Sequence, residues 1–261
     1  MMAMLNFLVI LVLTLGSGCA HYLRPEDKRW KLLFFTFIGA FVVTFWDSFW
    51  LIKFKDSIPL KYDQYAYYLD RMMFWGNSNF YLGQFLDHHS AVKAVTTYVY
   101  LGFLFPLWAI IFMYALKIPD EARKVVFTIL LNLGLAIPLY AICPVAGPKY
   151  VFPQFPDKIP VPMVPHALFL SAFPNGVPSV HTSTALLVLF FLSRWRLGKL
   201  FGIIWLGFTI LGTLGFGEHY LTDLLLAVPY TLGVIYLGGF EIVGKETNLP
   251  TCDLARAKRV P

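Results

Sequence analysis

The sequence predicts an all-α fold, a polytopic membrane helix bundle with six core transmembrane helices and one extra N-terminal helix. Hydrophobic residues make up 58% of the chain. Charged residues make up only 14%, whereas ordinary soluble domains carry about 25%. Several apolar runs also approach the roughly 20 residues that a helix needs to cross a bilayer. A soluble core could not bury so much apolar surface, so we expect a membrane protein.

Seven apolar runs account for the predicted spans. They are residues 2–20, 32–52, 97–116, 125–143, 178–193, 200–217 and 221–240. The first run resembles a cleaved signal peptide in length, but its start carries no Lys or Arg, so we expect a retained helix. The chain then divides into an N-terminal helix and loop (1–31), a six-helix membrane domain (32–240) and a basic cytoplasmic tail (241–261).

The placement of Lys and Arg predicts the orientation of these helices. Fourteen of the 21 basic residues lie in the loops 21–31, 117–124 and 194–199 and in the tail from 241. Because basic loops stay on the cytoplasmic side, the opposite ends should face the exterior, the periplasm or an organelle lumen. The net charge of +6 is explained by this topology and by anionic headgroups. It therefore requires no nucleic acid partner.

Two long segments, 53–96 and 144–177, connect helices on the predicted exterior side. The first is rich in Tyr, Trp and Phe, which suits short helices in the headgroup zone, either as an anchoring belt or as a lid that selects lipids. The second is rich in proline, which discourages helix. It delivers Lys149 and Ser179 to the same side of the membrane as His181 and His219.

Polar residues at the ends of the apolar runs predict the chemistry. His219 and Asp223 lie four residues apart and would share one helix face, so the carboxylate can accept the Nδ1 proton and leave Nε2 as a nucleophile toward phosphorus. His181, at the start of a neighbouring helix, is placed to protonate the departing alkoxide. Ser179 and the backbone N–H groups of that helix suit phosphate oxygens, and Lys149 adds positive charge. Considered without the other residues, His219 and Asp223 can form only a local hydrogen bond. Ser179 can likewise be only a helix cap.

These residues resemble the motifs of the type 2 phosphatidic acid phosphatase superfamily of integral membrane lipid phosphatases. Pro178 to His181 is similar to its Pro-Ser-Gly-His motif, and His219 to Asp223 is similar to its His-x-x-x-Asp motif. The likeness covers roughly residues 32–240, including the placement of the motifs among the helices. It implies that His219 forms a phosphohistidine and that Asp223 orients it. By the same likeness His181 protonates the leaving group, Ser179 binds phosphate, and neither metal nor cofactor is required.

Departures from the family motifs bear on the substrate. The third motif places an Arg six residues before its nucleophile, where this chain has Thr213, and the Gly of the second motif is Val180. The first motif is reduced to Pro144 to Lys149, with Pro156 where a later Arg is expected. We expect hydrolysis of a lipid phosphate ester. The alternative is headgroup transfer between lipids, because the inositol phosphorylceramide synthase-like branch keeps both histidines and the aspartate while relaxing the arginines.

The remaining polar residues leave further alternatives open. Asp47 can pair with Lys53 or touch a headgroup, and we favour the pairing. Asp87, His88 and His89 are typical of a solvated loop, with metal binding as the alternative. A lipid transporter or lipid-binding protein is the second class of function, but its charges should lie near the midplane of several helices. The substrate lipid and the oligomeric state stay open.

Overall fold

The computed structural model describes residues 2–74, 77–161 and 164–241. The tail from 242, which belongs to the predicted cytoplasmic segment, lies outside these residues. The helices are α1 (Met2–Leu23), α2 (Lys28–Ser57), α3 (Asp63–Phe74), α4 (Ser78–His88), α5 (Ser90–Leu101), α6 (Phe105–Lys117), α7 (Pro119–Gly134), α8 (Ala136–Ile142), α9 (Pro148–Val151), α10 (Val180–Leu192), α11 (Arg196–Gly215) and α12 (Leu221–Leu237). Two short strands, β1 (Leu60–Lys61) and β2 (Leu168–Phe169), complete the described part.

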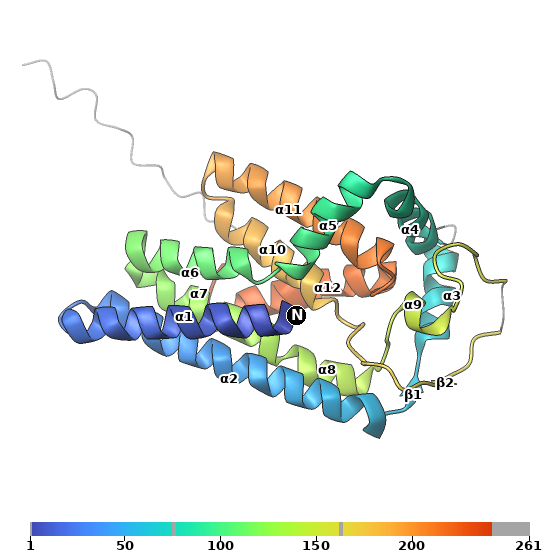
Figure 1. The fold of residues 1–261 in the computed structure, drawn as a ribbon, viewed down its shortest axis with the longest axis horizontal. Coiled ribbons are helices and arrows are strands. Elements are labelled where there is room, and N and C mark those ends of the chain that lie inside the picture. The colour runs from blue at the N-terminus through green and yellow to red at the C-terminus, as the bar shows by residue number, and fades with distance from the viewer. Residues whose placement is uncertain (1, 75–76, 162–163, 242–261) are drawn as a thin grey trace, which may run out of the picture.

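The long helices pack as a bundle around one apolar core. α1 packs along α2, α2 and α6 pack against α7, and α10 packs against both α11 and α12 (Figure 1). Fully buried side chains at this core include Leu33, Phe37, Leu107, Ile111, Val125, Ile129 and Leu187. Large apolar side chains also remain exposed on α2, α11 and α12, for example Phe45, Ile203 and Leu226. This outer apolar surface suits contact with lipid.

The helical fold class is confirmed, and every predicted apolar run lies mostly within helix. By length and composition, α2, α11 and the Pro119–Ile142 pair formed by α7 and α8 are able to cross a membrane. The α5–α6 pair passes the same test as a bent span. Residues 8–23, 180–192 and 221–237 form shorter apolar helices. Six core spans and one extra span therefore remain a prediction, while a mostly helical fold with three or four candidate spans is shown within the described residues.

Two local predictions require correction. The run predicted as a span over 97–116 begins inside α5, and the chain bends by 53° between α5 and α6. The bend falls where Gly102 ends α5 and Pro106 occupies the first turn of α6, because proline has no N–H to continue the helical ladder. The chain is also not purely helical, since Leu60 pairs with Phe169 and Lys61 with Leu168 in a small antiparallel sheet.

The two segments predicted to lie on the exterior side gather at one end of the bundle (Figure 1). The aromatic segment forms α3 and α4, as the prediction of short helices requires. α4 and α5 pack against α11, and α3 packs against α12 and α9. The proline-rich segment runs mostly without regular structure from α9 back to the start of α10. This end of the bundle therefore holds the starts of α10 and α12 together, and both carry predicted site residues.

Candidate active site

Three loops meet at this end of the bundle, which we call the motif loops: residues 144–149, 175–179 and 217–220. The N–H of Gly176 donates to the carbonyl of Val145 at 2.7 Å, and the N–H of Lys149 donates to the carbonyl of Gly217 at 3.1 Å. Gly147 has φ +120°, and a Cβ there would lie 2.4 Å from the carbonyl oxygen of Glu218. Glycine is thus required at that position, both for the backbone conformation and for the contact between loops.

His219 lies in the turn before α12, which corrects the predicted arrangement on a single helix face. Tyr220 is extended (φ −88°, ψ 160°) and ends the turn, so α12 begins at Leu221. Asp223 accepts the Tyr220 N–H at 2.8 Å, as acidic residues do in the first turn of a helix. Its Oδ2 still lies 3.6 Å from Nδ1 of His219. The two side chains are therefore neighbours, but Asp223 is not the nearest partner of the imidazole.

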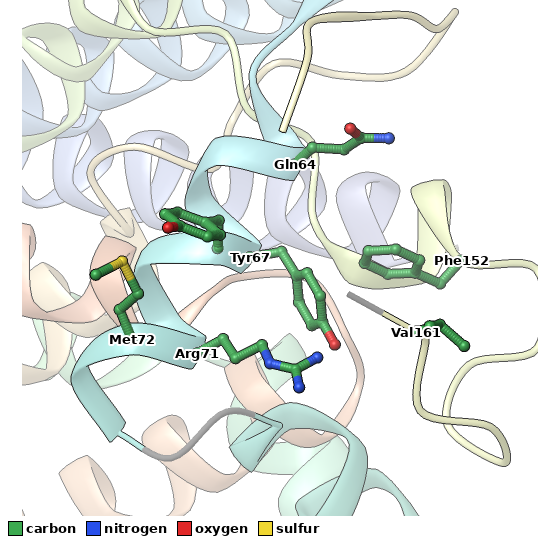
Figure 2. Close-up of a pocket in the computed structure, with 7 residues that line it drawn as sticks. Gln64, Tyr67, Arg71, Met72, Phe152 and Val161 are labelled. Carbon is green, nitrogen blue, oxygen red and sulfur yellow. The ribbon is translucent and has the colours of Figure 1, made fainter. Parts of the chain in front are cut away.

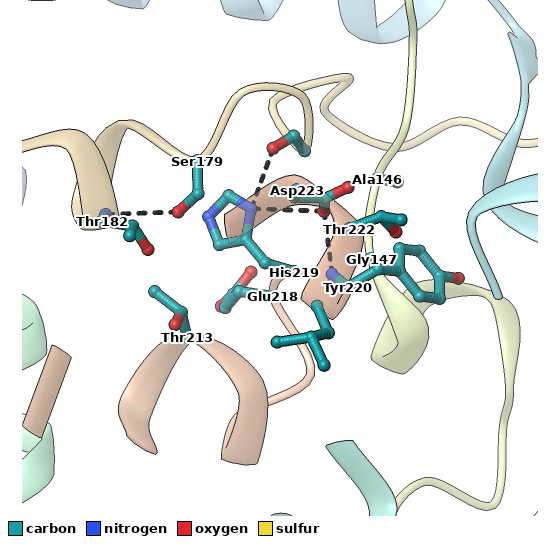
Figure 3. A network of polar contacts seen from close by, with 12 residues as sticks. Ala146, Gly147, Ser179, Thr182, Thr213, Glu218, His219, Tyr220, Thr222 and Asp223 are labelled. Carbon is teal, nitrogen blue, oxygen red and sulfur yellow. Dashed lines mark hydrogen bonds and ion pairs between the residues drawn. The ribbon is translucent and has the colours of Figure 1, made fainter. Parts of the chain in front are cut away.

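The nearest partner of His219 fixes the tautomer of its ring. Nδ1 lies 3.0 Å from the carbonyl oxygen of Gly176. Because a carbonyl only accepts, Nδ1 must carry the proton, and a neutral ring then presents a lone pair at Nε2. His219 is only 1% exposed, and its Nε2 has no hydrogen-bond partner within the described residues. Figure 3 shows Nε2 directed away from Asp223, toward the side where Ser179 and Thr182 lie.

His181, in the first turn of α10, is held by aromatic rings. It stacks on Tyr100 with ring centroids 4.2 Å apart and an interplanar angle of 8°. Phe103 contacts the same ring at 4.4 Å. The ring centroids of His181 and His219 lie 5.9 Å apart. The structure therefore brings the two predicted histidines together, each with different surroundings.

Ser179 and Thr182 occupy the start of α10 beside His219. Ser179 is fully buried and is the N-cap of α10, with its Oγ accepting the Thr182 N–H at 3.3 Å. The capping alternative for Ser179 is thus present in the structure. The Ser179 N–H donates to the carbonyl of Asp223 at 3.3 Å, which ties α10 to α12. The Thr182 hydroxyl is buried without a partner in the described residues. Sequence reasoning missed Thr182, because a threonine in an apolar helix carries no distinguishing signal.

Lys149 reaches the motif loops but its charge is already paired. Its ammonium forms an ion pair with the carboxylate of Glu218, and Tyr150 donates to the same carboxylate at 3.2 Å. Burial acts to lower the pKa of the Lys149 ammonium, yet the Glu218 carboxylate raises that pKa above its ordinary value. The predicted contribution of one free positive charge at this face therefore needs correction, because Glu218 neutralises it.

Two buried carboxylates on α3 support the motif loops and were not predicted. Asp63 accepts the N–H groups of Ala146 (3.0 Å) and Gly147 (2.7 Å). Asp70 accepts the N–H groups of Leu221 (2.6 Å) and Thr222 (2.7 Å). Burial raises the pKa of each carboxyl to about 6, although the hydrogen bonds act in the opposite direction. One face of α3 thus holds the first motif loop at one end and the start of α12 at the other.

The other side of α3 lines a separate cavity of about 190 Å³. Figure 2 shows Tyr67 and Arg71 extending from α3 toward Phe152 and Val161 across this cavity. The ring of Tyr67 packs against that of Phe152 with centroids 4.9 Å apart. Neither predicted histidine lines this space. We therefore place the candidate active site at the motif loops, where the buried imidazoles meet.

Thr213 occupies the family position of the missing arginine and touches the site through its backbone. Its carbonyl accepts the N–H groups of Glu218 and His219, each at 3.2 Å. Its hydroxyl donates back to the carbonyl of Thr209 at 2.9 Å. The side chain is fully buried and carries no charge. This position therefore holds the turn that bears His219 and supplies no cation to the site.

Comparison with known proteins identifies the family. A family model described as the PAP2 superfamily matches residues 67–237, which is more than half of the chain. The helical membrane fold and this match together define an enzyme class, the phosphatase-type membrane proteins that act on lipid phosphates. The chain belongs to the PAP2 superfamily, so the resemblance seen in its motifs is confirmed. No curated protein and no solved structure matches the chain significantly.

Proposed function

We propose that this chain cleaves a lipid phosphate ester through a phosphohistidine at His219 and completes the reaction with water. The observation that supports this mechanism is the buried Nε2 of His219, which has no partner among the described residues while Nδ1 is held by the Gly176 carbonyl. A buried polar atom without a partner is costly, and the unused lone pair at Nε2 is suited to attack on phosphorus. Asp223, 3.6 Å from Nδ1, stabilises the positive charge that develops on the ring.

The proposed reaction has two steps. In the first, the Nε2 lone pair forms a bond to phosphorus, the phosphorus–oxygen bond to the lipid alcohol breaks, and His181 gives its proton to the departing oxygen. In the second, His181 takes a proton from water, which attacks phosphorus and releases Nε2. The N–H groups at the start of α10 and the Thr182 hydroxyl are suited to the non-reacting phosphate oxygens. The site is proposed to face the exterior, periplasmic or lumenal side, as the distribution of basic residues predicts.

Headgroup transfer between lipids is the second candidate function. Its supporting observation is the low positive charge of the site, since Glu218 pairs with Lys149 and Thr213 stands in the arginine position. A phosphodiester carries one negative charge, whereas a phosphomonoester dianion carries two and needs more positive charge around it. In this case a lipid alcohol replaces water as the acceptor in the second step. The chemistry at His219 and His181 is the same for both candidates.

Trapping of the covalent intermediate tests the proposal. Purified protein is mixed with a lipid phosphate carrying labelled phosphorus, quenched within one turnover and digested, and the labelled peptide is identified. We expect an acid-labile, base-stable label on His219, and His219→Ala should reduce turnover by at least about 10³-fold. His88→Ala is the matched control, because His88 is exposed and, within the described residues, its ring bonds only the Gln84 carbonyl. Full turnover by His219→Ala, or a label on another residue, would contradict the mechanism.

A further inference from the structure

Asp47, an acidic residue within the apolar helix α2, has no hydrogen-bond or ion-pair partner among the described residues. Asp47 lies between Trp46 and Ser48 in a segment that qualifies as a membrane span. The ion pair with Lys53 that the sequence favours is absent among the described residues, and Oδ1 of Asp47 is buried without a hydrogen bond. An ionisable group at membrane depth is costly and is by default a sign of function. The hydroxyl of Thr44, one turn earlier, is also buried and unpartnered.

These unpartnered groups border one cavity. Thr44, Asp47, Ser48 and Leu51 follow the spacing i, i+3, i+4 and i+7, which places them on a single face of α2. That face lines a cavity of about 220 Å³ between α2 and the neighbouring helices. The rest of the wall is mainly apolar, with Phe103, Leu104, Leu133, Ala136, Ile137 and Val180, and it also carries Tyr140, Asn175 and His181. The cavity therefore combines a largely apolar wall with a few hydrogen-bonding side chains, which is the pattern of an amphiphile site.

His181 connects this cavity to the candidate active site. It lines the cavity directly, and its ring centroid is 5.9 Å from that of His219. Phe103 also lines the cavity and packs against the His181 ring at 4.4 Å. His181 thus lies between His219 and the cavity. In the proposed mechanism, His181 also exchanges a proton with the alcohol oxygen. An alcohol bound in the cavity would therefore have its oxygen beside His181.

We propose that this cavity binds the alcohol part of the lipid, as leaving group or as acceptor, with its reacting hydroxyl at His181. A second hydrogen-bond donor of the same molecule, one or two carbons away, donates to the carboxyl oxygen of Asp47, and the Thr44 hydroxyl binds beside it. The alkyl chain packs against the apolar wall. The inference rests on the proposed function for the role of His181, and it adds the class of alcohol: a long-chain lipid alcohol that carries a second donor.

Photolabelling tests this inference without any turnover. Two diazirine-bearing probes are used in lipid nanodiscs with the full chain: a monoacylglycerol, which has a second hydroxyl, and a fatty alcohol of equal chain length, which has none. We expect the monoacylglycerol to label peptides covering residues 44–51 and 133–137 at least five-fold more than the fatty alcohol does. Unlabelled monoacylglycerol should compete for this labelling.

Substitutions on α2 sharpen the test. Asp47→Leu removes the acceptor and should abolish the five-fold preference for the second hydroxyl, and Thr44→Val should reduce it. Because Asp47→Leu removes a polar group from membrane depth, folding is not at risk, and thermal unfolding checks this. Asp56→Leu is the matched control on the same helix, since Asp56 is exposed, bonds Ser171 and does not line the cavity. It should keep the preference.

The outcomes separate this inference from the proposed function. Equal labelling by both probes, or an unchanged preference in Asp47→Leu, overturns the alcohol site, even if His219 carries phosphate. Labelling confined to lipid-facing positions of α2 such as Phe45 overturns it as well. Selective labelling in a protein that never forms a phosphohistidine supports the alcohol site and rejects the proposed function instead.

Discussion

The surroundings of His219 and His181 differ, although their rings lie only 5.9 Å apart. His219 is held by polar backbone groups: the Gly176 carbonyl bonds its ring, and the Thr213 carbonyl accepts its N–H. His181 is held by the rings of Tyr100 and Phe103, and no hydrogen bond to a described residue fixes either of its nitrogens. The first arrangement selects one tautomer, whereas the second positions a ring and leaves both nitrogens able to exchange protons.

This difference teaches how two identical side chains acquire different proposed roles. A nucleophile must present a lone pair in a fixed direction, and the carbonyl contact at Nδ1 of His219 provides that direction. An acid that later acts as a base must take up and release a proton, and stacking constrains the ring without committing a nitrogen. The aromatic side also borders the cavity beside α2, while the polar side borders the motif loops.

Removal of His181 should give the largest change in rate that distinguishes the role of His181 from that of His219. His181→Ala should slow the cleavage of a lipid ester by about 10²–10⁴-fold, because the alkoxide then departs unprotonated. A nitrophenyl phosphate ester, whose leaving group needs little protonation, should lose far less activity. Steady-state rates with both substrates make the comparison. Equal losses would show that His181 does not act as the acid.

A smaller effect is expected when the carboxylate that holds the start of α12 is removed. Asp70→Asn replaces one accepting oxygen with a donor that opposes the N–H of Leu221 or Thr222, so the start of α12 should lose support. We expect a loss of about 1–3 kcal/mol in the free energy of unfolding, together with a lower kcat. Thermal unfolding in detergent and kinetics measure the two effects. Asp87→Asn, at an exposed residue paired with Lys93, is the control and should change neither.

The pH dependence of stability gives a further test of the same carboxylate. Burial raises the Asp70 pKa to about 6 in the folded protein, above its unfolded value, so the folded state binds this proton more tightly. The contribution of Asp70 to stability is therefore greatest below about pH 4 and decreases as pH rises through 6. The difference in free energy of unfolding between the wild-type protein and Asp70→Asn should decrease by on the order of 2 kcal/mol between pH 4 and 7. A constant or widening difference would contradict this assignment.

The smallest effect is expected from metal chelation, which should leave the reaction rate nearly unchanged. The proposed reaction uses an imidazole nucleophile, an imidazolium acid and hydrogen-bond donors, so EDTA should alter the rate by less than about two-fold. The rate is measured before and after dialysis against the chelator. A loss that one divalent ion restores would direct attention to Asp87, His88 and His89.

Much of the fold could be predicted from the sequence, because hydropathy reports directly on helices that contact lipid. The break at 102–104 was missed because Gly102 and Pro106 lie inside one continuous apolar run, whose mean hydropathy does not register them. The small sheet was missed for a different reason: its two strands are two residues each and lie more than a hundred residues apart. Pairing at that distance depends on tertiary structure rather than on local pattern.

The candidate site was predictable where side chains carry the chemistry and not where the backbone does. His181, His219 and Asp223 stand out as polar residues beside apolar runs. The carbonyl of Gly176 has no such signal, and Asn175-Gly176 indicates only a turn. Asp63 and Asp70 lie seven residues apart on an amphipathic helix, a pattern that usually marks a solvated face. Their burial against the motif loops becomes visible only once α3 is placed against α12.

The contact between Gly147 and Glu218 has a consequence for how this site can be transplanted or redesigned. Because the motif loops lock together through backbone atoms at Gly147 and Gly176, copying only His181, His219 and Asp223 onto another bundle would not reproduce the positions of their rings. A designer would need the three loop backbones first, with both glycines retained, and the reactive side chains second. The α2 face proposed to bind the alcohol lies outside these loops, so catalytic geometry and lipid preference can be engineered separately.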